Sequence, residues 1–156
     1  MRPFMRALAL IALLAFPSLS RADVPYKNCI DVRGHNVLWM ADGSLRGLAQ
    51  AGYTDDDWPL VRYNPEILSS LRPQTRLYFQ VHECAHHVFG HSIRGGMSLA
   101  DEKLADCWAL NSLLHGGSFG EADVSLVQEE IARLADGDWT HIPGPRRKIN
   151  LKSCSK

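Results

Sequence analysis

The run HECAHHVFGH at residues 82–91 constrains the local structure of this chain more tightly than any other stretch. His82 and His86 are four residues apart, so on an α-helix they lie about 40° apart around the axis and one turn apart along it. Both imidazoles can then reach one zinc ion at about 2.0–2.1 Å without any bending of the backbone. Glu83 lies next to that face, where it can accept a proton from a zinc-bound water. The spacing predicts a helix that carries two metal ligands and a general base.

This helix is predicted to run from about Thr75 to Phe89, with Gly90 as its C-terminal cap. Cys84 is rotated about 200° from His82, so it points away from a metal held by the histidines and is interpreted as a core or disulfide cysteine. The alternative for the whole run is a histidine-rich helix surface that binds no metal and performs no chemistry.

Two histidines and a water leave a zinc site short of one ligand, and two downstream residues are candidates. His91 follows Gly90, so the chain is predicted to have left the helix and its side chain to be poorly placed to return. Glu102 and Asp106 are again four residues apart, on a helix predicted from a capping box at Ser98 to about Leu114. One carboxylate can bind zinc while the other holds the free ring nitrogen of a ligand histidine. The alternative is a solvated acidic helix face.

The motif HExxH, followed one helix later by ExxAD at residues 102–106, resembles small secreted or periplasmic zinc metallopeptidases of the gluzincin type. The resemblance covers about residues 60–115, including VRYNPEIL before the metal helix. It implies hydrolysis of peptide bonds and the following roles: zinc ligands His82, His86 and Glu102, catalytic base Glu83, and Asp106 as the support of a ligand histidine.

Larger relatives of this type usually place a histidine or tyrosine on a later element to stabilise the oxyanion. His141, in WTHIPGPRR, is the best candidate for that role in this chain. The alternative is an exposed histidine in the C-terminal tail.

The remaining segments predict an α+β fold, a minimal zincin-like domain that is mostly helical with a small antiparallel sheet. The stretch from Cys29 to Ala41 suggests a hairpin, and a polar segment rich in Gly and Asp follows it up to Trp58. Residues 60–63 form a further short strand. Asn64 and Pro65 then open a short helix, and a last helix begins near Glu121 with a buried stripe.

The N-terminus has the layout of a secretory signal peptide over residues 1–22, which leaves a single domain at residues 23–156. Arg2 and Arg6 precede an apolar run at 7–16, and the small residues Ser20 and Ala22 stand at positions −3 and −1 of the expected cut. The run is too short to span a bilayer stably. The alternative is an apolar helix packed on the domain. We expect an exported protein, periplasmic or extracellular, with no stable membrane insertion after signal removal.

An even number of cysteines in an exported chain favours two disulfides, and the four allow three pairings. Because Cys84 points away from the metal and Cys107 directly follows Asp106, we expect Cys84–Cys107 to join the two ligand helices. Cys29 would then pair with Cys154, although the other pairings remain possible.

Charge and size limit the possible functions. Removal of the signal leaves 14 basic against 17 acidic residues, a net charge of −3 that gives no indication of nucleic-acid binding. The expected cofactor is Zn²⁺ and the expected partner is a peptide or protein substrate. Two alternatives stay open, namely a secreted binding or structural domain that keeps a zinc site without catalysis, and a zinc hydrolase of cell-wall amides.

Overall fold

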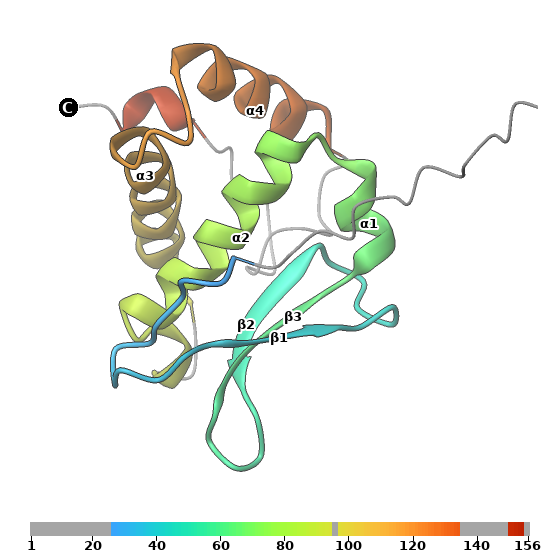
Figure 1. Cartoon of the computed structure of the whole chain (residues 1–156), viewed down its shortest axis with the longest axis vertical. Coiled ribbons are helices and arrows are strands. Elements are labelled where there is room, and N and C mark those ends of the chain that lie inside the picture. The colour runs from blue at the N-terminus through green and yellow to red at the C-terminus, as the bar shows by residue number, and fades with distance from the viewer. Residues whose placement is uncertain (1–25, 95–96, 135–149, 155–156) are drawn as a thin grey trace, which may run out of the picture.

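Helices and a small sheet make up the described part of the chain, which in this computed structural model comprises residues 26–94, 97–134 and 150–154. The expected α+β class is confirmed. Residues 1–22, which the sequence predicts to be a signal peptide, and His141 lie outside the described residues. The elements, shown in Figure 1, are strands β1 (Leu38–Ala41), β2 (Ala49–Tyr53) and β3 (Pro59–Tyr63), helices α1 (Pro65–Ser70), α2 (Pro73–Val88), α3 (Leu99–His115) and α4 (Glu121–Arg133), and the single 3₁₀ turns η1 (His91–Ile93) and η2 (Leu151–Ser153).

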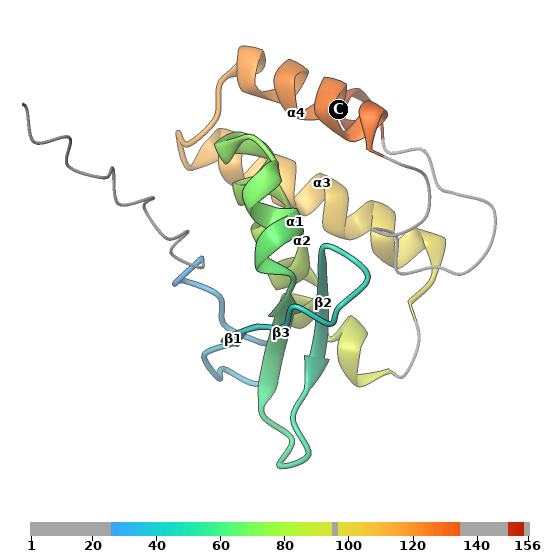
Figure 2. The same cartoon turned by 90° about the vertical axis from the view of Figure 1, so that its right-hand side faces the viewer.

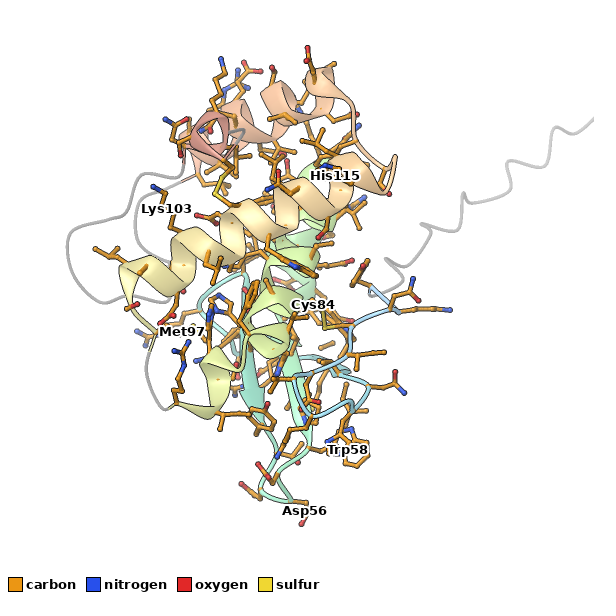
Figure 3. All side chains as sticks on the ribbon, turned by 90° about the vertical axis from the view of Figure 1, so that its left-hand side faces the viewer. Asp56, Trp58, Cys84, Met97, Lys103 and His115 are labelled. Carbon is orange, nitrogen blue, oxygen red and sulfur yellow. A yellow bond between two sulfur atoms is a disulfide. The ribbon has the colours of Figure 1, made fainter. Side chains whose placement is uncertain are left out.

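The sheet has the strand order β1-β3-β2 and is mixed, so the expected antiparallel sheet is wrong in one respect. Strands β2 and β3 are antiparallel because a short hairpin loop joins them, with Asp56 at its tip in Figure 3. Strand β3 lies between β1 and β2. Strand β1 pairs with the edge of β3 opposite β2, and the two strands run parallel. The hairpin expected at Cys29–Ala41 is reduced to an isolated bridge between Ile30 and Asn36.

Strand β2, with the sequence AQAGY, lies in a segment that the sequence predicts as irregular. Alanine and glycine are poor strand formers, so local preference gives little indication of a strand here. Pairing with β3 decides the conformation instead, with Ala51 opposite the fully buried Val61.

Local capping signals are confirmed in detail. The Oδ1 atom of Asn64 accepts from the backbone N–H groups of the first turn of α1, and Ser98 forms a capping box with Asp101 at the start of α3. Gly90 follows the end of α2 with φ 66°, a left-handed conformation that glycine adopts without steric cost. Helices α2 and α3 begin and end within two residues of the predicted positions.

Helix α2 lies between the sheet on one side and helices α3 and α4 on the other, as Figures 1 and 2 show from two directions. Every residue from Tyr78 to His87 is therefore buried. Apolar side chains such as Val81 and Leu110 supply the core, but the same helix also takes polar side chains into the interior. Buried polar groups need partners, so this helix must be matched by polar groups on its neighbours.

The disulfides join Cys29 to Cys84 and Cys107 to Cys154, so the predicted pairing is wrong. Cys84 does point away from the face of α2 that carries His82 and His86, as predicted. That side of the helix, however, meets the N-terminal segment, as the position of Cys84 in Figure 3 shows, whereas α3 packs on the metal face. Cys84 and Cys107 therefore lie on opposite sides of α2, and Cys107 bonds to the segment at η2 instead.

Two disulfides are typical of proteins in an oxidising, exported environment. Within the three described ranges, no helix combines the length and the apolar character that crossing a membrane requires.

Candidate metal centre

His82, His86 and Glu102 come together between α2 and α3, in a group that could hold a metal ion. Their potential ligand atoms all lie within 4.8 Å of one another. His82 Nε2 is 3.4 Å from Glu102 Oε2, and His86 Nε2 is 3.5 Å from Glu102 Oε1. All three side chains are at most 1% exposed. The solvated acidic face considered for Glu102 is therefore absent.

Two features of local structure bring these atoms together. The helical repeat of α2 places the two imidazoles one turn apart on one face. The Ser98 cap starts α3 so that Glu102 falls in its first turn, and the packing of α3 on α2 turns that carboxylate inward.

His82 is oriented by Asp106, whose Oδ1 lies 3.0 Å from the ring Nδ1. Tyr78 donates its hydroxyl to the same oxygen at 2.8 Å, which holds the carboxylate in place. A proton on Nδ1 is favoured by this carboxylate, which leaves the Nε2 lone pair directed at His86 and Glu102. Asp106 thus contacts the candidate ligand His82 and is not itself a member of the group that could hold the metal.

The side chain of His91 lies against α2, next to His86, so the expectation that it is poorly placed to reach this helix is wrong. Its Nδ1 lies 3.0 Å from His86 Nδ1, and its Nε2 lies 3.3 Å from Asp101 Oδ1. The left-handed conformation of Gly90 reverses the chain and brings η1 back against α2. Sequence reasoning missed His91 and Asp101 as neighbours of the site, although the glycine after the helix was the available signal.

The electrostatics of the group favour a cation. His82 Nε2 and His86 Nε2 lie 3.1 Å apart. If both rings carry their protons on Nδ1, two lone pairs face each other, and a cation between them removes the repulsion. Burial alone would lower the pKa of His82, but hydrogen bonding to Asp106 and Glu102 raises it to about 9. Without a metal the ring therefore holds a second proton at pH 7, and a metal bound at Nε2 would replace that proton. Burial lowers the pKa of His91, which keeps that ring neutral at pH 7.

Glu83 lies on the side of α2 that faces the sheet and is 2% exposed. Its Oε2 accepts a hydrogen bond of 2.9 Å from the backbone N–H of Ala51 in β2. This bond holds the carboxylate against β2. The charge of Glu83 also helps to raise the pKa of His82, so the carboxylate lies within electrostatic range of the histidines.

The remaining histidine of the run, His87, has a different environment. Its Nε2 lies 3.1 Å from the carbonyl oxygen of Leu60, and its ring meets Tyr53 edge-on. Burial lowers its pKa, so it is a neutral side chain between α2 and the sheet.

Comparisons of the chain with models of protein families, with curated proteins and with solved structures find no match. The site therefore has to be interpreted from its own geometry. It consists of a buried group of two imidazoles and one carboxylate that could hold a metal ion, with a second buried carboxylate beside it.

Proposed function

We propose that this protein hydrolyses peptide bonds with zinc, using Glu83 as the general base. The observation that carries the proposal is a buried group of two histidines and one glutamate, with the buried carboxylate of Glu83 following His82 on α2 and acting electrostatically on that ring. Two histidines and a carboxylate leave zinc a net positive charge and an open position for water, as catalytic zinc sites do.

The spacing of the donor atoms supports zinc as the metal. Ligand atoms about 2.05 Å from a zinc ion at tetrahedral angles lie about 3.3 Å from one another. The two imidazole Nε2 atoms lie 3.1 Å apart, close to that value. Each faces a different oxygen of Glu102, Oε2 at 3.4 Å for His82 and Oε1 at 3.5 Å for His86, and with one ligand atom from each residue the three atoms lie within 4.8 Å of one another. Nitrogen and oxygen donors in this number suit zinc, whereas magnesium and calcium take mainly oxygen.

Glu83 supports catalysis over a structural role for the metal. A structural zinc site is closed by four protein ligands and needs no acid beside it. Zinc, when bound, supplies Lewis acidity that polarises a carbonyl and makes water a better nucleophile. Glu83, held at Oε2 by Ala51, would take a proton from the attacking water at Oε1 and pass it to the leaving amine nitrogen.

Strand β2 supports a peptide as the substrate. Along an antiparallel strand, successive residues alternate between bonding to the partner strand and facing away from it. Leu48 and Thr54 form backbone hydrogen bonds with residues on the β3 side, so the peptide groups of Ala51, an odd number of residues away, face away from β3. The Ala51 N–H donates to Glu83 on that side. An extended peptide beside such a strand would be aligned by backbone hydrogen bonds, with its scissile bond near the base.

The test uses the purified protein with casein and, separately, with peptidoglycan, each with and without a chelator and after re-addition of zinc. We expect cleavage of casein that the chelator abolishes and zinc restores. Cleavage of peptidoglycan alone would favour a hydrolase of cell-wall amides. Zinc binding without cleavage of either substrate would favour a binding or structural domain.

The substitution Glu83→Gln separates catalysis from metal binding. It removes the base but none of the ligands, so we expect full zinc content with turnover lowered by about 100- to 10,000-fold. Glu66→Gln, which changes an exposed glutamate on α1, is the matched control and should keep wild-type turnover. Undiminished turnover in Glu83→Gln would remove Glu83 from the mechanism.

A further inference from the structure

We propose that His91 and Asp101 are positioning residues that hold His86 in the tautomer that binds metal. The inference rests on the proposed zinc site but concerns affinity for the metal, so it can be tested without any measurement of hydrolysis. The two residues lie outside the motifs that define the site, on η1 and in the first turn of α3.

The first step is the direction of the His86 ring. Its Nε2 faces His82 and Glu102, while its Nδ1 lies 3.0 Å from His91 Nδ1. An imidazole that offers the lone pair of Nε2 to a metal carries its proton on Nδ1, so that N–H needs an acceptor. The lone pair on Nδ1 of His91 is in position to accept it.

The second step fixes the tautomer of His91. If its Nδ1 accepts from His86, its own proton is on Nε2, which lies 3.3 Å from Asp101 Oδ1. A carboxylate favours an N–H at that position. The order from the metal outward is therefore His86, His91, Asp101, with one proton between each pair.

The same geometry shows why His91 is not a third ligand. The two nitrogens of an imidazole point in divergent directions, and His91 approaches His86 at Nδ1, on the side away from Nε2. A metal bound by His86 Nε2 and Glu102 lies beyond the reach of a ring in that place. The structure gives His82 a direct carboxylate partner in Asp106, and gives His86 a carboxylate through an intervening imidazole.

Asp101 also couples this chain of contacts to the third candidate ligand. Its Oδ2 accepts from the backbone N–H and the hydroxyl of Ser98, at 3.0 and 2.9 Å, and completes the cap of α3. Its Oδ1 faces His91 and accepts from Arg94 at 3.0 Å. One carboxylate thus orients His86 and fixes the first turn of the helix that carries Glu102.

The experiment measures the affinity of purified variants for zinc by competition with a chelating dye. His91→Phe keeps an aromatic ring, somewhat larger than imidazole, but removes the acceptor, and should bind zinc about 10- to 100-fold more weakly. His91→Asn places an oxygen near the position of Nδ1 and should stay close to wild type. His115→Phe, which changes an exposed histidine at the far end of α3 (Figure 3), is the matched control and should bind as wild type does.

A second pair of variants separates the contact with His91 from the helix cap. Asp101→Ala and Ser98→Ala both remove hydrogen bonds of the cap, but only Asp101→Ala removes the partner of His91. Asp101→Ala should therefore weaken zinc binding more than Ser98→Ala does. In the cobalt-loaded protein, His91→Phe should also shift the visible absorption bands of the metal, which report its ligand field.

Several outcomes would overturn the inference. Wild-type zinc affinity in His91→Phe is one, and equal losses in His91→Phe and His91→Asn is another, because the second result would indicate a packing role only. Equal losses in Asp101→Ala and Ser98→Ala would also contradict it. If the wild-type chain binds zinc but cleaves no substrate, the proposed function fails while these affinity differences still decide this inference.

Discussion

His82 and His86 present the same atom, Nε2, to one point, and each is held there by a different partner at Nδ1. Asp106 lies 3.0 Å from the first ring and His91 lies 3.0 Å from the second. Outer partners of this kind set the tautomer and basicity of a ligand histidine, and their loss typically costs less than the loss of a ligand. Substitution of a candidate ligand should therefore weaken zinc binding more than substitution of a residue that contacts a ligand.

Glu102→Ala should lose most bound zinc and all activity, because it removes one of the three candidate ligands from a buried site. Asp106→Ala should keep the site but weaken zinc binding by about 10- to 100-fold. Metal content and zinc affinity of the purified variants check both expectations, with the exposed Glu66→Ala as control. Retention of wild-type affinity in Glu102→Ala would contradict its assignment as a ligand.

At the level of elements, the N-terminal segment holds the metal helix from the side opposite α3. Cys29 is bonded to Cys84, and the backbone N–H of Val32 donates to the carbonyl oxygen of His87 at 3.0 Å. Asp31, buried in this segment, accepts from the backbone N–H groups of Arg33 and His35 at 2.9 and 2.8 Å. The segment thus stabilises the C-terminal half of α2.

Asp31→Ala should lower the free energy of unfolding by about 1.5–3 kcal/mol at pH 7, the usual contribution of hydrogen bonds to a charged group. Burial acts to raise the pKa of Asp31, but its hydrogen bonds with His35 and Arg33 outweigh burial and hold the pKa below the ordinary 3.8. The charged form is favoured in the folded state, so its contribution is present above about pH 3.8 and is lost as pH falls through the folded pKa.

Urea unfolding of both proteins at a series of pH values from 7 to 3 checks this expectation. The difference between wild type and Asp31→Ala should shrink as the solution becomes more acidic than pH 3.8. Asp56→Ala, at the exposed tip of the β2–β3 hairpin, should change stability little at any pH. A difference that stays constant with pH would show that the charge of Asp31 contributes nothing.

At the level of the whole molecule, the candidate metal site lies between α2 and α3, the two longest helices of the described residues, and consists of buried polar side chains from both. His82 and His86 on α2 and Glu102 on α3 are all in the interior, where polar groups destabilise a fold unless they are matched. A metal ion bound by all three would link α2 to α3 in the folded state only. Binding and folding are therefore coupled.

Zinc should raise the thermal midpoint of the wild-type protein. At a free zinc concentration 100 times Kd, binding to the folded state alone adds about 2.7 kcal/mol, which is on the order of 10 °C in Tm for a chain of this size. Thermal unfolding followed by circular dichroism, with zinc and with a chelator, measures the shift. Glu102→Ala should show no such shift, and its absence in the wild type would mean that the folded protein does not bind zinc.

Features that depend on neighbours a few residues apart could be predicted from the amino-acid sequence. The spacing of His82 and His86 sets their common face on any helix, and Asn64, Ser98 and Gly90 mark helix ends because caps bond to the adjacent turn. The same local reasoning pointed to Glu102 as the candidate ligand on the next helix, where the structure brings it beside both histidines.

Which faces of the helices and strands pack against each other could not be predicted from the sequence. Cys84 pairs with Cys29 because α3 packs on the opposite side of α2, and no property of the cysteines themselves indicates that choice. The parallel pairing of β1 with β3 and the return of His91 to His86 are likewise contacts between segments, set by how the chain reverses and packs. Such contacts depend on the burial of whole surfaces, and local spacing carries no information about which surface a helix buries against which neighbour.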